Sequence, residues 1–293
     1  MDRLSRLASR LRLALRILEG HWSQPATALW RLFEAEVVRA RLQAEGRCLD
    51  LGCGDGTLAP LLVEGAGPAV WIGLDLDPRE VRLAARTGAY RGVCAASAEG
   101  LPFPAGAFDL VLSNSALEHM DHLDWVLAEA AQALRPGGML VFTVPSDQFH
   151  RRLLWPRLLR GLGLGRLAER YLRHLDRRLR HLRYPTPEEW TERLDRHGFR
   201  VRVLESYLSG AATAAWETLA NLTGGLVHLA RRGRGAPREA QLTAGLGGSR
   251  SRVLGALAFL LLLPALLWTA AESPPRAGAG LYAEAVREPP GSR

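Results

Sequence analysis

The sequence predicts an α/β fold built on a doubly wound, mostly parallel sheet. Apolar, strand-like segments alternate with helix-like segments, a pattern typical of a parallel sheet with helices on both faces. A glycine-rich turn, Gly52-x-Gly54-x-Gly56, follows the first strand-like segment, and an acidic residue, Asp75, ends the second. The five strand-like segments lie near 47–51, 70–75, 92–95, 108–113 and 139–144. Ligands of such sheets bind beyond the carboxyl ends of the strands, where the turn and Asp75 lie.

Residues 1–45 are predicted to form N-terminal helices. Residues 3–18 have leucines at helical spacing with arginines between them, as in an amphipathic helix. The arginines exclude a signal peptide, whose central region is apolar. Such a helix either packs on the domain or lies on an anionic membrane surface. A second helix is expected over Thr27–Ala44.

The glycine turn also indicates the charge of its ligand. Glycines allow a tight turn and leave room for a ligand against the backbone. Asp50 lies just ahead of Gly52, whereas a pyrophosphate site relies on bare N–H groups at a helix N-terminus. A carboxylate suits a cationic ligand instead, such as one with an ammonium and a sulfonium. Asp75 lies 23 positions after Gly52, close to the offset at which doubly wound domains place a ribose-binding carboxylate.

Composition limits the classes of protein to which the chain can belong. The 293 residues suffice for one large domain or for a domain with additions. Lysine is absent, so the basic charge is carried by arginine. Cys48, Cys53 and Cys94 lack metal-ligand spacing and indicate reduced side chains of a cytosolic protein, not a disulfide framework.

The net charge of +8 is unevenly distributed along the chain. Residues 1–18, 151–183 and 231–252 carry +4, +9 and +5, which leaves −10 for the other residues. The predicted sheet domain is therefore acidic, and the basic charge lies on its additions. This distribution argues against a basic surface over the whole fold and favours local contacts with an anionic partner.

Several segments, in the right order, resemble the class I S-adenosylmethionine-dependent methyltransferases. They are RCLDLGCGDGT (47–57), WIGLDLDP (71–78), AEGLPFPAGAFDLVLSNSALEHM (98–120), and RPGG followed by MLVFTVP (135–145). Residues 184–207 look like the following helix and sixth strand, and GLYAEAVRE (280–288) looks like the seventh strand, antiparallel beside the sixth. The resemblance implies a Rossmann-like, seven-stranded sheet that binds S-adenosyl-L-methionine.

The resemblance also implies which residues bind this cofactor. The turn would hold its methionine part, Asp75 would accept both ribose hydroxyls, and Leu76 would pack on the adenine. Ser97 stands where the family often has an acid for the adenine amino group, so this bond falls to a weaker acceptor or to the backbone. The expected cofactor-binding residues, which follow the first four strands along one edge, are Asp50, Gly52, Gly54, Gly56, Asp75, Leu76, Ser97, Ala98 and Asn114.

Methyl transfer from a sulfonium is an in-line displacement that requires no metal and no covalent nucleophile; the protein aligns the reactants and excludes water. A hydroxyl acceptor benefits from a general base, and His119 is the candidate because it follows the Asn114 strand on the cofactor edge. Asp121, His122 and His150 are poorer candidates. Alternatively, His119 caps the next helix or lines the pocket, and a carbon or amine acceptor needs no base.

The predicted domain organisation places additions around a core. Residues 46–150 form the cofactor-binding core, and 184–208 supply its later helix and sixth strand. Residues 151–183 are predicted to form a basic helical cap, whose charges face solvent or contact lipid headgroups or an acidic substrate. An apolar and basic insertion, 209–279, precedes the last strand at 280–288. The apolar stripe expected in the cap comprises Leu164, Leu167, Tyr171, Leu172, Leu175, Leu179 and Leu182.

The insertion contains an uncharged, apolar run at 253–271. As a helix it would be about 28 Å long, close to a hydrocarbon core of about 30 Å. Because the insertion joins neighbouring strands, both its ends lie on one side of a membrane, which excludes a single crossing. We favour a re-entrant or in-plane segment, kinked or broken at Pro264, with the arginines of 231–252 at the cytoplasmic leaflet. The alternatives are a second crossing through 211–230 and a helix buried in the cap.

These features support three functional hypotheses. The first is a methyltransferase associated with the cytoplasmic face of the membrane, acting on an amphiphilic or lipid-linked acceptor. The second is a soluble methyltransferase of RNA or a small metabolite, although the arginine stretches lack aromatic platforms and known RNA-binding motifs. The third is a non-catalytic, membrane-tethered module that binds the cofactor. The expected partners are therefore a small-molecule or lipid-like acceptor and an anionic membrane surface, and nucleic acid is not expected.

Overall fold

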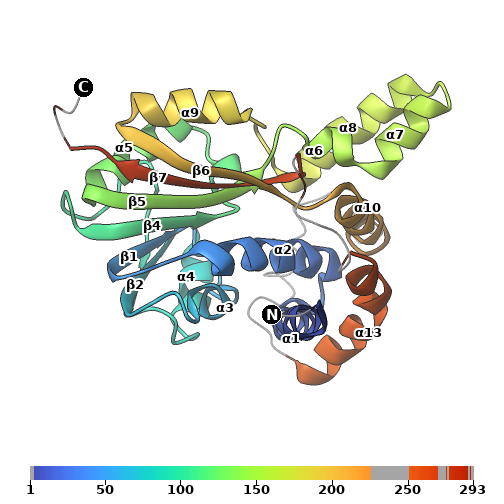
Figure 1. The fold of residues 1–293 in the computed structure, drawn as a ribbon, viewed down its shortest axis with the longest axis horizontal. Helices are drawn as coiled ribbons and strands as arrows, with labels where there is room; N and C mark the ends of the chain where they lie inside the picture. The colour runs from blue at the N-terminus through green and yellow to red at the C-terminus, as the bar shows by residue number, and fades with distance from the viewer. Residues whose placement is uncertain (1–2, 226–250, 270–274, 276, 290, 292–293) are drawn as a thin grey trace. The chain divides into compact units, whose positions relative to one another are not determined.

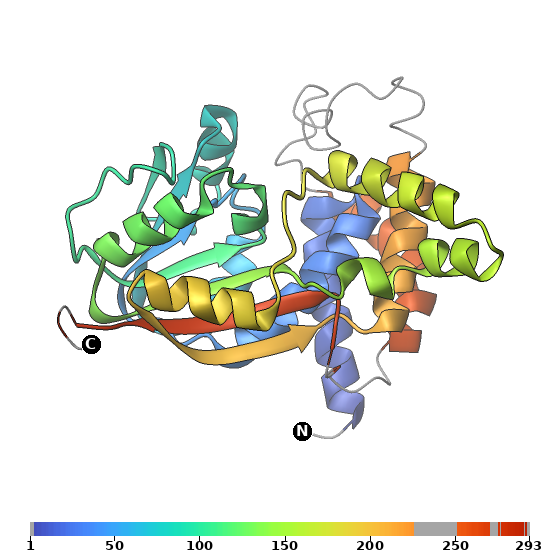
Figure 2. The same ribbon diagram turned by 90° about the horizontal axis from the view of Figure 1, so that it is seen from above.

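The computed structural model describes residues 3–225, 251–269, 275, 277–289 and 291 of the chain (Figures 1 and 2). The chain divides into two compact units. The sheet unit comprises residues 37–147, 182–206 and 280–293, and the helical unit comprises 1–36, 148–181 and 207–279. Of the basic stretch predicted at 231–252, all but the last two residues lie outside the described part of the chain.

The sheet unit contains a seven-stranded sheet in the order β3-β2-β1-β4-β5-β7-β6. β1 pairs in parallel with β2 and β4, β2 with β3, and β4 with β5, whereas β7 runs antiparallel to β5. The order reverses between β1 and β4, which makes the sheet doubly wound, as predicted. The strands are β1 (Gly46–Leu51), β2 (Ala69–Asp75), β3 (Gly92–Ala95), β4 (Phe108–Asn114), β5 (Leu134–Pro145), β6 (Phe199–Tyr207) and β7 (Gly280–Arg287).

The last two strands lie side by side, as predicted. Ala279, just before β7, donates its N–H to the carbonyl of Leu208, just after β6, at 2.9 Å. Glu288, just after β7, donates to the carbonyl of Gly198, just before β6, also at 2.9 Å. These bonds join opposite strand ends, so β6 and β7 run antiparallel. The insertion between them therefore begins and ends at the same place.

Helices cover both faces of the sheet (Figure 1). α5 and α9 lie on one face, and α3 and α4 lie on the other (Figure 1). The helices of this unit are α3 (Ala59–Val63), α4 (Pro78–Ala84), the 3-10 helix η1 (Leu117–His119), α5 (Leu123–Ala133) and α9 (Pro187–Arg196). α9 begins with a capping box between Thr186 and Glu189, which satisfies N–H groups that a helix start leaves open. Trp190 of α9 packs on Phe142 of β5 in the buried core, with ring centroids 4.7 Å apart.

β5 begins earlier than predicted and contains the predicted RPGG turn within it. Leu134 pairs with Phe108, but the next pair joins Met139 to Leu110. Residues 135–138 therefore bulge out of register, and Gly137 has a φ of +79°, a conformation that favours glycine. The turn thus interrupts the pairing without ending the strand.

The helical unit gathers segments that are far apart in the sequence. Its helices are α1 (Arg3–His21), α2 (Pro25–Arg41, which continues into the sheet unit), α6 (Phe149–Arg152), α7 (Leu154–Gly161), α8 (Gly165–Leu179), α10 (Gly210–Leu219), the π-helix η2 (Ala220–Gly225) and α13 (Arg252–Thr269). Trp30, Phe149 and Trp216 pack edge to face. The buried Glu34 accepts hydrogen bonds from Trp30 Nε1 at 2.8 Å and from the Tyr207 hydroxyl at 3.2 Å. Each of these buried polar groups therefore has a partner.

The predicted end of the second helix was wrong. α2 ends at Arg41, not Ala44, because Ala44 donates its N–H to Ala66 in the approach to β1. The cap stripe is only partly buried: Leu172 and Leu175 are buried, whereas Leu164 and Leu167 are about half exposed.

Pro264 neither breaks nor reverses the apolar helix. α13 is continuous from Arg252 to Thr269 with Pro264 inside it. A proline removes one intrahelical hydrogen bond, and the leucines and alanines around it are strong helix formers. The prediction of a chain reversal at this residue was therefore wrong.

Candidate functional site

The glycine turn follows β1 at the switch point of the sheet. Gly52, Gly54 and Gly56 have φ values of +80°, +54° and +67°, which side chains other than glycine rarely adopt. The N–H groups of Gly52 and Cys53 donate to the carbonyl of Leu74 at 2.8 and 2.9 Å, which fixes the turn against the end of β2. A Cβ at Gly52 would lie 2.6 Å from Ala116 Cβ, whereas a Cβ at Gly54 would meet no atom within 4 Å. Gly54 is thus the point where the turn leaves open space for a ligand.

Asp75 ends β2 and binds the turn directly. Its Oδ2 accepts the N–H of Gly54 at 2.9 Å, and its Oδ1 accepts the N–H of Asp77 at 2.9 Å. An ionised carboxylate offers about four acceptor positions, so each oxygen keeps capacity for a further donor, such as a ribose hydroxyl. Leu76, beside it, is 73% exposed and has room to pack on an aromatic ring.

Asp50 has a partner that the sequence analysis missed. This residue is only 6% exposed, and its Oδ2 accepts the Tyr90 hydroxyl at 2.5 Å. Burial, together with the Asp50 charge, raises the pKa of Tyr90, which keeps the phenol protonated as a donor. The Tyr90 ring also fills the space beside Gly56 and Gly73, where a Cβ would lie 3.0 and 3.3 Å from it. No motif in the sequence links Tyr90 to Asp50.

Carboxylates surround Cys53 in the turn and make the electrostatic potential there negative. Burial raises the pKa of the Cys53 thiol, and the carboxylates of Asp50, Asp75 and Glu80 raise it further. Cys53 therefore stays a neutral thiol within a group of carboxylates. This field matches the cationic ligand that the sequence predicted, and the residues of the turn fit S-adenosylmethionine.

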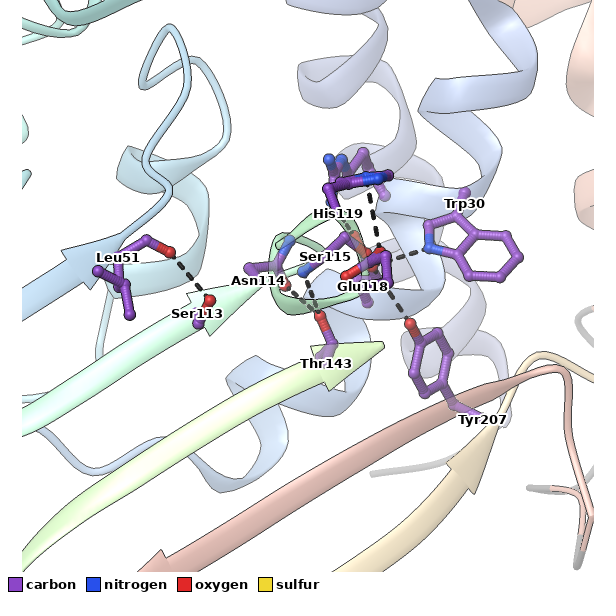
Figure 3. A network of polar contacts seen from close by, with 11 residues as sticks. Trp30, Leu51, Ser113, Asn114, Ser115, Glu118, His119, Thr143 and Tyr207 are labelled. Carbon is purple, nitrogen blue, oxygen red and sulfur yellow. Dashed lines mark hydrogen bonds and ion pairs between the residues drawn. The ribbon is translucent and has the colours of Figure 1, made fainter. Parts of the chain in front are cut away.

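Residues after β3 and β4 continue the same edge of the sheet. Ser97 is exposed, and its Oγ accepts the N–H of Glu99 at 3.1 Å, which uses one of its two acceptor positions. Ala98 packs against the core of the sheet unit. The Thr143 hydroxyl donates to Asn114 Oδ1 at 3.0 Å (Figure 3). Because β3, β2, β1 and β4 are parallel neighbours, the structure brings the predicted cofactor residues to one edge.

The ends of β1, β4 and β5 are joined by polar contacts. Ser113 donates its hydroxyl to the carbonyl of Leu51, directly before the glycine turn, at 2.9 Å (Figure 3). Ser115 has a φ of +46° and donates its N–H to the Thr143 hydroxyl at 3.0 Å (Figure 3). These contacts fix the chain as it leaves β4 towards His119.

His119 ends η1, in a loop that makes hydrogen bonds with Leu182 and Arg183. Its side chain is 41% exposed and lies 3.9 Å from the carboxylate of the buried Glu118. The carbonyl of Glu118 accepts the N–H of Leu182 at 3.2 Å, and Arg183 donates to the carbonyls of Met120 and Asp121 at 3.1 and 2.8 Å. His119 is therefore placed near the edge by backbone contacts and leaves its ring accessible.

The poorer base candidates make other contacts. The His122 ring packs beside Trp125 with centroids 4.8 Å apart. His150, in the helical unit, lies 2.8 Å from Asp176 Oδ1 through Nε2. His119 and His122 are both exposed, whereas His150 is half-buried.

The sequence and the fold are similar to those of known methyltransferases. The family model described as a methyltransferase domain matches residues 22–204. Three relatives share 30–35% identity over part of the chain. The phthiotriol/phenolphthiotriol dimycocerosates methyltransferase 1 of Mycobacterium ulcerans is 35% identical over 42% of this chain and 46% of its own length. The ubiquinone/menaquinone biosynthesis C-methyltransferase UbiE of Cupriavidus necator is 33% identical over 39% of this chain and 48% of its own length.

The third relative is the fatty-acid O-methyltransferase of Mycolicibacterium smegmatis, 30% identical over 48% of this chain and 51% of its own length. The chain thus matches about half the length of these relatives. A solved methyltransferase from Thermotoga maritima, described as a possible histamine N-methyltransferase, has a TM-score of 0.51 at 18% identity, over 88% of this chain and 89% of its own.

The [4+2]-cyclase SpnF has the same TM-score of 0.51 at 20% identity, over 87% of this chain and 79% of its own. At these identities the solved structures show the fold alone. The match to the family model covers more than half of the chain, in agreement with the resemblance in its motifs. The chain therefore belongs to the methyltransferase domain family.

Proposed function

We propose that this enzyme methylates an amphiphilic or lipid-like small molecule at the inner face of a membrane. The agreement among its relatives carries the proposal: their names specify a fatty acid, phthiotriol dimycocerosates and the ubiquinone/menaquinone pathway. The apolar helix α13 supports it, since a lipid-like acceptor must be taken up from an apolar phase. The acceptor class suits the apolar additions to the fold better than RNA does.

The turn and the first two strand ends are proposed to bind the methyl donor. S-adenosylmethionine supplies an activated methyl group on a sulfonium. Asp50 and the glycine turn hold the methionine part of the cofactor. Asp50 balances the positive charge of this part, and the Tyr90 hydroxyl orients the Asp50 carboxylate. Asp75 accepts the ribose hydroxyls through the positions left by its two backbone bonds.

The remaining predicted residues are proposed to complete the cofactor site. Leu76 covers one face of the adenine, and Ala98 lies beside its binding position. Ser97, through its second acceptor position, or the backbone next to it, accepts the adenine amino group. Asn114 closes the edge at the end of β4, where its side chain is fixed by Thr143.

His119 is proposed to act on the acceptor. For a hydroxyl or carboxyl acceptor, its accessible ring accepts or shares the proton that the acceptor loses. A carbon or amine acceptor requires only that the loop around His119 positions the acceptor and excludes water. The two chemistries thus predict different effects of removing the imidazole.

A labelled-methyl assay tests the proposal. The full chain is incubated with S-adenosylmethionine carrying a tritiated methyl group and, separately, with a long-chain fatty acid, demethylmenaquinone, bulk RNA or water-soluble amines. We expect label in the organic phase with one of the first two acceptors and, at a subsaturating concentration of S-adenosylmethionine, about 10- to 100-fold less label with Asp75→Asn as the control. Label only in RNA or in the aqueous amines would contradict the lipid-like acceptor and support the soluble alternative.

A further inference from the structure

The apolar helix α13 has one face buried within the helical unit. The buried positions recur at helical spacing: Gly255, Ala258, Leu262, Leu266 and Thr269. α13 packs on α1, which lies beside it in both views (Figures 1 and 2). A Cβ at Gly255 would lie 3.0 Å from the backbone of Glu19 in α1, and Ser251 donates its N–H to the Glu19 carbonyl at 2.9 Å. α13 is therefore fixed to α1 by close backbone contact.

The opposite face of α13 is apolar and exposed. We call it the outer face of α13, and its members are Val253, Leu254, Leu257, Leu260, Leu261, Leu267 and Trp268. Leu261 is 78% exposed, Val253 72% and Trp268 60%. By length and composition α13 is the only candidate membrane span in the described part of the chain, and just 28% of it is buried. The core helix of a soluble protein would be mostly buried, and soluble monomers rarely expose a contiguous apolar patch of this extent.

The contacts of α13 oppose a crossing of the bilayer. α1, beside it, carries the exposed arginines Arg12 and Arg16. A spanning α13 would carry these guanidinium groups into the hydrocarbon, where charged side chains are strongly disfavoured. The two ends of the insertion also lie side by side, because the N–H of Ala279 donates to the carbonyl of Leu208. A helix that lies in the plane of the membrane satisfies both observations, because it keeps α1 on the aqueous side.

The charge of the helical unit identifies the surface that fits the outer face. This unit has 23 arginines and 9 acidic residues, whereas the sheet unit has 15 arginines and 21 acidic residues. Their net charges are therefore +14 and −6. A second copy of the chain would bring like charge against like charge, whereas an anionic bilayer attracts the basic unit and receives its apolar side chains. Trp268, at the end of α13, is a residue type enriched at membrane interfaces.

We propose that the outer face of α13 docks in the surface of an anionic bilayer, with the helix axis parallel to the membrane plane. This inference deepens the proposed function, on which it rests for its purpose, by assigning the surface through which the enzyme reaches a lipid-like acceptor. Its physical basis is independent of the acceptor's identity, because the docking uses no residue of the cofactor edge.

Vesicle flotation of the full chain tests the docking. The probes are vesicles of phosphatidylcholine alone and of phosphatidylcholine with phosphatidylglycerol. We expect binding to the anionic vesicles, weakened by salt, and a loss of about tenfold or more in the double variant Leu260→Gln/Leu261→Gln. The matched control is Leu158→Gln/Leu162→Gln, which removes two exposed leucines in and just after α7 of the same unit and is expected to bind as the unaltered chain does. No binding to anionic vesicles, or equal losses in both variants, would overturn the proposal.

Two labelled variants distinguish in-plane docking from a crossing. A fluorophore that dithionite quenches is attached to Val253→Cys and, separately, to Trp268→Cys, at the two ends of the outer face. In-plane docking leaves both labels open to dithionite added outside the vesicles, whereas a crossing protects one of them and would contradict the proposal. All variants are first shown to bind S-adenosylmethionine with unchanged affinity, which establishes that the sheet unit is folded. If the chain docks but methylates no lipid-like acceptor, the proposed function fails and the docking stands. If the chain methylates a dispersed lipid but does not dock, the proposed function stands and the docking fails.

Discussion

At the scale of single residues, the carboxylates that hold the turn in place are also the groups proposed to bind the methyl donor. Both oxygens of Asp75 accept backbone N–H groups, one from Gly54 inside the turn. Asp50 is buried and fixed by Tyr90. We therefore expect ligand affinity and turn geometry to depend on the same atoms, so that a substitution at either carboxylate changes both.

We expect Asp75→Asn to weaken S-adenosylmethionine binding by about 10- to 100-fold. The amide has one acceptor oxygen and no charge, and hydrogen bonds to charged groups contribute about 1.5–3 kcal/mol. Isothermal titration calorimetry measures the change in affinity. The matched control is Asp77→Asn, two residues away: Asp77 caps α4, and asparagine caps helices equally well, so affinity should not change. Equal losses in both variants would show that Asp75 acts only through the local fold.

Tyr90→Phe should weaken cofactor binding severalfold and lower the free energy of unfolding by about 1–3 kcal/mol, because a buried carboxylate loses a donor. Tyr282→Phe is the control, since the Tyr282 hydroxyl donates to Glu284 at 2.7 Å on β7, away from the turn. The control should lose stability but keep its affinity. An unchanged affinity in Tyr90→Phe would mean that Tyr90 only fills space beside the glycines.

His119→Gln separates the two chemistries proposed for the acceptor. If the imidazole is a general base, kcat should fall by about 10²–10⁴, with little change in cofactor affinity. His122→Gln, whose ring packs beside Trp125, is the control and should keep most of the activity. A kcat within about twofold of the unaltered enzyme would instead indicate an acceptor that needs no base.

At the scale of elements, small residues decide how closely helices approach. Gly255 in α13 meets the α1 backbone, where even a methyl group would lie 3.0 Å from Glu19. Gly165, the first residue of α8, has open space around its Cα. The same residue type thus permits close contact in one helix and makes no such contact in the other.

Gly255→Ala should therefore lower the free energy of unfolding by about 1–3 kcal/mol, as overpacking does, despite the better helix propensity of alanine. Gly165→Ala should be neutral or slightly stabilising. Urea unfolding followed by circular dichroism measures both. Stabilisation by Gly255→Ala would show that α13 can move away from α1 at no cost.

At the scale of the whole molecule, chemistry and surface charge belong to different units. The proposed cofactor edge lies in the acidic sheet unit, and the outer face of α13 lies in the basic helical unit. Two separate ligands, the methyl donor and the bilayer, are therefore expected to stabilise different parts of the chain.

Hydrogen exchange should resolve the two effects. Saturating S-adenosylmethionine should slow exchange at the turn after β1 and at the ends of β2 and β3, and at about 100 times its Kd should stabilise the chain by about 2.7 kcal/mol. Anionic vesicles should slow exchange in α13 and leave the turn unchanged. Protection of α13 by the cofactor alone would contradict this separation.

The sequence by itself determined the order of the elements and the sheet edge at which the predicted cofactor residues gather. Glycines at positive φ, acids at strand ends and the alternation of strands with helices are local properties, so the pattern predicted the parallel strands and the clustering of Asp50, Gly54 and Asp75. The antiparallel β7 was predicted from the resemblance to the family. The family match confirmed the family that these motifs indicate.

Only the tertiary structure decided which face of an apolar helix is buried, and which residue completes the buried carboxylate. α13 is apolar all round, so no periodicity distinguishes its buried face from its exposed one; the packing of Gly255 on α1 does. Tyr90 and Asp50 lie 40 positions apart, and their pairing depends on how two segments pack. The continuity of α13 through Pro264 has the same cause, because packing and flanking leucines stabilise a helix that local propensity would end.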